Sequence, residues 1–457
     1  MNVCFLVLLL PLLGLNSFYL NYYTLQFALS LITFMLIVWS LSRSFSLFDI
    51  RTLVLSIGFT YICVAPIGVI YFDGYMQPGF SYWLSEESTY FSLAYGTIML
   101  SVMFLCFHSF KDFSFHLSNK TIKLYDSNIS VQIPFIIFLM VITLCMYQNI
   151  SEFGFSLGAI SRGEIYSNKS TFIQILTAMI APTFLYSYFT IFKQQKNSFI
   201  LKTLLYSTIG FYLLYTAIIM GDRKIVLQFI LAILVLKQLL NPVNFKTIFI
   251  RSVFFILFIP SLIIWGKFRN QSFSEYASIW NNLEVSNLFN PLLTEFGGAA
   301  FVADNLYTTN IQNYMQPSYL ESFLEMVPSA VWADRPDGPA RWFVWEYYPN
   351  YAASGGAFAF NALYESLMNF WYLGPIFAGI LWASLIILGC QIRNSYQPLI
   401  ISILAFNFMF FYRADLVSVI KPLSICLATF FLVYLCQFSS SLYKIDLKEY
   451  PSRHNLS

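Results

Sequence analysis

The chain has 457 residues, of which 58% are hydrophobic, 19% aromatic and only 10% charged. Soluble domains carry roughly 25% charged residues, so this composition excludes an ordinary soluble fold. The formal net charge of +3 is spread along the chain and gives no support for nucleic acid as a partner. The seven cysteines lie in or beside apolar stretches without a CxxC pair, so they predict neither a disulfide framework nor a metal site.

The apolar residues gather in blocks of about 20, the length that crosses ~30 Å of hydrocarbon. We therefore expect an all-α polytopic membrane protein with about twelve transmembrane helices. The first block predicts a membrane helix rather than a signal peptide, because no Lys or Arg precedes it and Pro11 interrupts it. In chain order, the blocks are 3–20, 23–42, 52–72, 89–108, 132–148, 172–192, 203–220, 225–240, 248–266, 369–390, 397–412 and 420–439.

These blocks divide the chain into four parts. Residues 1–266 predict a bundle of about nine spans, 267–364 a long outer segment, 365–440 the last three spans and 441–457 a cytoplasmic tail. Two stretches of the long segment, 291–304 and 316–333, have apolar residues at helical spacing. They predict short interfacial or re-entrant helices.

The distribution of cations predicts the orientation in the membrane. With the N-terminus in the cytoplasm, 15 of the 25 Lys and Arg residues lie on the cytoplasmic side, as membrane proteins prefer. Both termini are then cytoplasmic. Ten of the inner cations are Lys, whereas six of the ten outer ones are Arg. Because guanidinium binds phosphate through two parallel hydrogen bonds, the outer face is predicted to hold an anion site.

Four outer arginines stand out as candidate anion ligands. Arg223 lies in a tight turn between two blocks, and Arg162 and Arg413 each have an acidic residue two positions later. Arg335 stands between acids and prolines in the long segment. The alternative interpretation is structural, because turn capping and neutralised surface pairs also explain these patterns.

Two glutamates are candidate general bases. His108, His116 and His454 all fall on the cytoplasmic side, so any proton transfer on the outer face is left to a carboxylate or to the substrate. Glu295 precedes the pair Gly297-Gly298, and Glu365 follows the pair Gly355-Gly356. Glu365 is expected close to the outer membrane surface. Helix capping and interfacial solvation are the alternative interpretations.

The twelve-span plan, the Gly-Asp-Arg turn, the sequence MVPSAVWADRPDG and the sequence GGAFAFNALYESLMNFWYLGP resemble the O-antigen polymerases, the Wzy class. The resemblance is best over residues 206–379. It implies a GT-C-like glycosyltransferase of the bacterial inner membrane, with its active site facing the periplasm and with no cofactor or metal. Such an enzyme joins undecaprenyl-diphosphate-linked oligosaccharide units into surface polysaccharide by inverting transfer, with release of undecaprenyl diphosphate.

The resemblance also implies roles for individual residues. Arg223 and Arg162, and more loosely Arg413 and Arg335, would bind the lipid diphosphate. Flat aromatic side chains stack on sugar rings, although an interfacial aromatic belt explains them as well. A flippase and a chain-length regulator in the same membrane are the implied protein partners. The candidate glycan ligands are Arg341, Asp334, Trp332, Trp342 and Trp345.

Two other functions compete with this interpretation. An O-antigen ligase shares the architecture and the donor, but ligases usually carry a catalytic histidine in the long outer loop, and this chain has none there. A lipid-linked oligosaccharide flippase, or another transporter, typically has two similar halves and charges near the middle of its spans. Here nearly all charges lie at the ends of the spans, so the polymerase is favoured.

Overall fold

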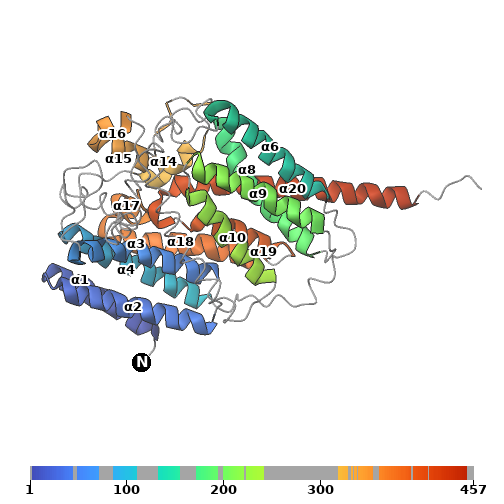
Figure 1. Cartoon of the computed structure of the whole chain (residues 1–457). Helices are drawn as coiled ribbons and strands as arrows, with labels where there is room; N and C mark the ends of the chain where they lie inside the picture. Colours follow the sequence, from blue (N-terminus) through green and yellow to red (C-terminus); the bar gives the residue numbers. More distant parts are fainter. Residues whose placement is uncertain are drawn as a thin grey trace, which may run out of the picture. The chain divides into compact units, whose positions relative to one another are not determined.

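The computed structural model describes residues 3–44, 49–71, 86–110, 132–154, 171–193, 199–220, 223–240, 317–327, 331–332, 334–336, 338–353, 360–392, 395–409 and 411–449. Every regular element among these residues is a helix (Figure 1). The chain divides into two compact units. Unit 1 comprises Met1–Ser114, Val243–Ile392 and Asn407–Lys421, and unit 2 comprises Phe115–Pro242, Arg393–Phe406 and Pro422–Ser457.

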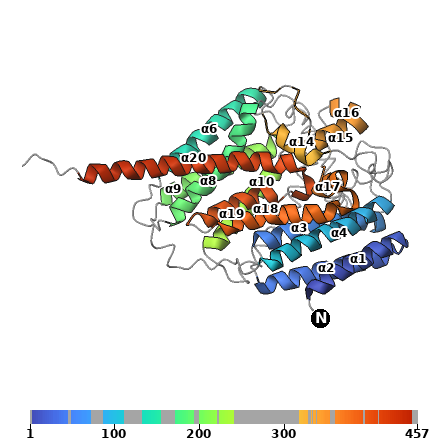
Figure 2. The same ribbon diagram turned by 180° about the vertical axis from the view of Figure 1, so that it is seen from behind.

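Unit 1 contains a bundle of long apolar helices. Helix α4 contacts α1, α2, α3 and α18, and α3, α4 and α18 lie side by side in Figure 1 and Figure 2. A Cβ on Gly379 of α18 would lie only 2.7 Å from the Met99 carbonyl oxygen of α4, so the backbones of these two helices approach closely. Small residues permit such contacts in membranes. The helices are α1 (Val3–Tyr19), α2 (Tyr23–Ser44), α3 (Ile50–Tyr71), α4 (Glu86–Ser109) and α18 (Gly374–Gln391).

Unit 1 also contains several short helices. Helix α17 leads into α18 through a break at Trp371, which has a φ of 54° and ends α17. Gly374 begins α18 so close to the Ser366 carbonyl that a Cβ there would overlap it. One apolar stretch of 30 residues, Ala362–Gln391, is therefore folded as two helices. The short elements are α14 (Ser318–Glu325), α15 (Pro339–Tyr347), α16 (Pro349–Ala353), α17 (Ala362–Phe370), η4 (Trp371–Leu373) and η5 (Phe411–Arg413).

Unit 2 is built mainly from α6, α8, α9 and α10, with α8 in contact with the other three. It also takes most of α19 and of α20, whose first residues belong to unit 1. The Tyr186 hydroxyl of α8 donates a 2.5 Å hydrogen bond to Gln437 Oε1 of α20. The bounds are α6 (Gln132–Phe153), α8 (Thr171–Lys193), α9 (Phe199–Ile218), α10 (Arg223–Leu240), α19 (Gln397–Phe408) and α20 (Leu416–Glu449).

Seven helices in the described part of the chain are long and apolar enough to cross a membrane, and three apolar helices are shorter. All expected blocks except 248–266 coincide with a helix, and that block lies outside the described residues. The prediction of an all-α polytopic membrane protein is therefore confirmed. The total of twelve spans and the orientation in the membrane stay predictions.

Candidate functional site

Three predicted site residues cannot be placed fully. Glu295 and Arg162 lie outside the described residues. Arg223 is the first residue of α10, and its side chain lies outside the described part. A helix does begin at the predicted tight turn, so Arg223 lies at a helix N-terminus.

The other predicted site residues all belong to unit 1, on or beside its short helices and the start of α20. Two buried carboxyl groups, those of Glu365 and Asp415, join these elements. We call this pair, together with the backbone N–H groups that it binds, the carboxylate junction. The predicted site residues in this region are Asp334, Arg335, Arg341, Trp332, Trp342, Trp345, Glu365 and Arg413.

Glu365 lies in the interior of unit 1. Its side chain has no exposed surface, and every residue of α17 from Ala362 to Met368 is buried. Its Oε2 accepts a 2.7 Å hydrogen bond from the Leu416 N–H, the first of α20, and its Oε1 accepts a 3.3 Å bond from the Ser322 hydroxyl of α14. The alternative interpretation, a carboxyl solvated at the interface, does not fit this burial, because α17 packs between α14 and α18.

Asp415 caps α20. Its Oδ1 accepts a 3.1 Å bond from the Ser418 N–H in the first turn of α20, and its Oδ2 accepts a 3.2 Å bond from the Ala340 N–H at the start of α15. The side chain is buried. The first N–H groups of a helix have no partner within the helix, and the helix dipole favours negative charge there. The junction therefore satisfies orphan donors of two helices at once.

Helix α14 is held against α17 by polar contacts. Asn369 Nδ2 donates a 2.6 Å bond to the Ser318 hydroxyl, and its Oδ1 accepts a 3.2 Å bond from the Tyr319 N–H. Ser318 is bonded to Asn369, and Ser322, one turn later in α14, is bonded to Glu365, one turn earlier in α17. The two helices therefore run antiparallel. Burial raises the pKa of the Tyr319 phenol well above its usual value, and the nearby Glu365 carboxyl raises it further. Tyr319 therefore stays a neutral phenol at neutral pH.

Arg335 caps the C-terminal end of α14. Its Nη1 donates bonds of 2.6 Å and 2.5 Å to the carbonyl oxygens of Glu325 and Val327. A cation is favoured at a helix C-terminus, where carbonyl groups lack partners. Lys421 of α20 lies within electrostatic range of both Arg335 and Glu325. A Cβ on Gly338 would overlap Glu325 Oε2, so a larger residue there would displace the end of the Glu325 side chain.

The remaining candidates lie on the surface around the junction. Arg341 and Trp345 are exposed on α15, and Trp332 and Asp334 are exposed in the turn before it. Trp342 is half-buried with its ring edge on Tyr347. Arg413 ends η5, half-buried, two residues before Asp415. Three cations of unit 1 thus lie near the junction in the chain or on its helices: Arg335 in the turn after α14, Arg413 at the end of η5 and Lys421 near the start of α20.

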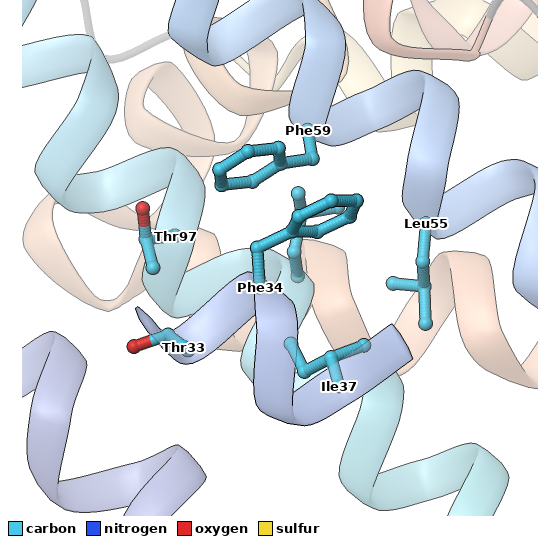
Figure 3. Close-up of a pocket in the computed structure, with 7 residues that line it drawn as sticks. Thr33, Phe34, Ile37, Leu55, Phe59 and Thr97 are labelled. Atoms are coloured by element: carbon cyan, nitrogen blue, oxygen red, sulfur yellow. The ribbon is translucent and has the colours of Figure 1, made fainter. Parts of the chain in front are cut away.

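A small apolar cleft lies elsewhere in unit 1, among α2, α3 and α4 (Figure 3). The rings of Phe34 and Phe59 stack in it with centroids 3.9 Å apart, and Thr33 and Thr97 lie on its wall. Its volume of about 10 Å³ is close to that of one water probe. It cannot hold a sugar or a lipid chain.

Sequence reasoning missed the structural residues of the junction. It singled out Asp415 only as the neighbour of Arg413, although an Asp directly before an apolar block is a typical N-cap. The same signal marks Asn361, whose side chain accepts a 2.9 Å bond from the Tyr364 N–H at the start of α17. The role of Ser322 has no such signal, because its bond to Glu365 joins segments 43 residues apart.

Among the described residues, no three His, Cys, Asp or Glu side chains gather where they could hold a metal ion. The site therefore offers buried carboxyl groups bound to backbone N–H groups, a nearby group of cations, and exposed indole rings. Comparison with models of protein families, with curated proteins and with solved structures finds no match to this chain.

Proposed function

We propose that the chain is a membrane glycosyltransferase that joins undecaprenyl-diphosphate-linked oligosaccharide units into an O-antigen or related polysaccharide. The proposal includes a GT-C-like architecture, a place in the bacterial inner membrane and an active site on the periplasmic face. A flippase and a chain-length regulator would work beside it. Its starting point is the resemblance of residues 206–379 to the O-antigen polymerases, on a chain whose described part has seven apolar helices long enough to span a membrane.

One structural observation supports the proposal most. Two segments that the sequence singles out contribute to the carboxylate junction, because Glu365 lies in 355–375 and accepts from the Leu416 N–H, directly after the stretch 412–415 that ends in Asp415. Asp415 also binds the Ala340 N–H, two residues after the stretch 326–338. The start of a short helix, a broken membrane helix and the start of a long helix thus share one set of contacts. Residues from distant segments that converge with buried polar groups are typical of a functional site.

The cations have a chemical role in this proposal. In glycosyl transfer from a lipid diphosphate, the leaving diphosphate gains negative charge in the transition state, and fixed cations stabilise that charge. Arg335, Arg413 and Lys421 are candidates in unit 1, and Arg223 and Arg162 stay candidates from the sequence. The exposed Trp332 and Trp345 rings offer flat apolar faces to the sugars.

Both buried carboxyl groups bind N–H groups at the start of α20. We assign Asp415 to positioning, because both of its oxygens bind backbone N–H groups. Glu365 has the same kind of contacts, so it reaches a sugar hydroxyl only if α14 moves away. Its use as a general base stays a prediction, as does that of Glu295. In the structure as it stands, Glu365 positions the start of α20.

The test is a polymerisation assay with the full chain in proteoliposomes and lipid-linked repeat units as the substrate, with a second reaction that also contains a lipid A core acceptor. We expect a ladder of lipid-linked polymers and release of undecaprenyl diphosphate. Deletion of the gene should leave single repeat units on the surface glycan. Units that cross the membrane without being joined would identify a flippase, and transfer to a lipid A core alone would identify a ligase. Either result would refute the proposal.

An arginine variant tests the diphosphate role separately. Arg335→Lys keeps the charge but loses the planar fork that holds two oxygens, and one charge-assisted bond is worth ~1.5–3 kcal/mol. The rate should fall roughly tenfold to a hundredfold. Lys202→Arg, on α9 of unit 2, is the control and should keep the rate. A normal rate for Arg335→Lys would remove Arg335 from the diphosphate site.

A further inference from the structure

Helix α14 exposes its apolar side chains and buries its serines, the reverse of a surface helix in a soluble protein. Leu320, Phe323 and Leu324 share one face and are exposed, Leu320 by 62% and Phe323 by 55%. Ser318 and Ser322, which lie on the opposite face, are buried. Residues three and four apart share a face of a helix, so the split is a property of the whole helix. We call the three exposed residues the α14 apolar face.

Apolar surface on α17 and α18 continues from this helix. The Tyr319 ring lies 5.9 Å from the Phe370 ring at the end of α17, and Phe370 stacks on Phe377 of α18 at 4.5 Å. Phe370, Leu373 and Phe377 are all exposed. Helix α18 lies within an apolar stretch long enough to cross a membrane, so its exposed apolar side chains face lipid. The surface around α14 is therefore connected, residue by residue, to a lipid-facing surface.

We propose that α14 lies in the bilayer surface, with its apolar face on the acyl chains and its serine face clamped on α17. The occupant of the apolar face is bilayer lipid, since the exposed residues carry no charge and adjoin the lipid-facing side of α18. A helix with one apolar face lies in the plane of a membrane interface in this way. Trp332 is exposed in the turn beyond α14. We place it at the same depth in the membrane, because indole rings prefer the interface.

This arrangement connects the membrane surface to the carboxylate junction. Ser322, opposite the α14 apolar face, donates to the same Glu365 carboxyl that binds the first N–H of α20. Ser318 and Tyr319 are bonded to Asn369. In this proposal, lipid contact on the α14 apolar face stabilises the position of α14 in which Ser322 is bonded to Glu365. The inference stands whether or not the chain is a polymerase, since it uses only contacts and exposure.

The experiment places a photoreactive side chain on the α14 apolar face. Phe323→p-benzoylphenylalanine is made in the full chain, which is reconstituted in nanodiscs of phosphatidylethanolamine and phosphatidylglycerol and irradiated. The new side chain is close to Phe in shape and lies on an exposed position, so folding is preserved. The matched control is Glu346→p-benzoylphenylalanine, an exposed position on α15. Adducts are identified by mass spectrometry of the intact chain and of its peptides.

We expect lipid adducts at position 323 in at least fivefold excess over position 346. Adducts that join position 323 to another segment of this chain, or to a second copy, would overturn the proposal by naming a protein as the occupant. Equal lipid labelling at both positions, or none at 323, would overturn it as well. Activity is not used as a readout, so a failure here is distinct from a failure of the proposed function.

Discussion

Two regions of unit 1 use their polar side chains in opposite ways. In the long helices, hydroxyl groups bond back within their own helix, as Ser17 does to the Leu13 carbonyl and Thr33 to the Leu29 carbonyl, both at 2.8 Å. In the short helices, polar groups join elements that are far apart in sequence, as Ser322 and Leu416 do through Glu365. Some side chains of the long helices also bond across helices: Gln26 Nε2 donates to the Tyr90 carbonyl of α4, the Thr97 hydroxyl donates to Ser30 Oγ of α2, and the Tyr19 and Tyr95 hydroxyls are bonded to each other.

The difference shows where this fold depends on individual polar groups. A hydroxyl bonded within its own helix competes with a backbone bond that exists anyway, so its loss changes little. A buried carboxyl that accepts from a helix terminus leaves an unsatisfied donor when it is removed, and this is costly. Variants should therefore separate into two groups, with large effects at the carboxylate junction and small effects in the long helices.

The largest effect is expected for Glu365→Ala. It removes the acceptor of the Leu416 N–H and leaves a void in a fully buried site, which together lower the free energy of unfolding by ~2–4 kcal/mol. Glu365→Gln keeps an oxygen for the Leu416 N–H and an amide for the Ser322 hydroxyl. Its free energy of unfolding should therefore fall by less than about 1 kcal/mol. The measurement is reversible unfolding in mixed micelles. A glutamine variant that is stable but inactive would show that Glu365 acts chemically as well.

A smaller effect is expected for Gly374→Ala, at the break between α17 and α18. The added methyl group overlaps the backbone around Ser366, and overpacking of this kind typically costs ~1–3 kcal/mol. The control is Gly210→Ala in α9, where a Cβ has no heavy atom within 4 Å and should be neutral or stabilising by up to about 1 kcal/mol. Equal thermal stability of the two variants in detergent would mean that the close approach is not required.

Asp415→Ala should cost about 1 kcal/mol, the usual value for loss of an N-cap. Asp415→Asn keeps an oxygen for the Ser418 N–H and should cost less, because Asn is an equally good cap, although it loses the acceptor of the Ala340 N–H. Thermal unfolding of the two variants side by side measures the difference. If alanine and asparagine are equally stable, the cap is not a stabilising part of the junction.

The long helices were predictable because their signal is local. Blocks of about 20 apolar residues with charges at their ends predict a span wherever they occur, and α6, α8 and α18 all begin within a few residues of the expected positions. The break at Trp371 was not predictable in the same way. The Gly374-Pro375 pair does mark the start of α18. A positive φ at Trp371 depends on packing around Gly374 and Ser366, and no residue type at that position indicates it.

The site was predictable in its location but not in its contacts. The turn around Arg335 and the acid at 365 were both singled out because charged and turn-forming residues are rare in this chain. The burial of Glu365 was missed, since it depends on α14 covering α17 with serines instead of leucines. A reversed helix of this kind is amphipathic by period, but the period does not say which face points inward.

The smallest effect is expected for Thr33→Val in α2, and it tests the other half of the comparison. Thr33 is fully buried, and valine keeps its shape while removing only the hydroxyl that bonds to Leu29. Because the Leu29 carbonyl keeps a second lone pair and its place in the helix, the free energy of unfolding should change by no more than about 0.5 kcal/mol. Ser322→Ala is the matched variant from the short helices, and it should cost more, since it removes a donor from the buried Glu365. A loss above about 1 kcal/mol for Thr33→Val would show that hydroxyls in the long helices also hold the fold together. The contrast between the two regions would then be wrong.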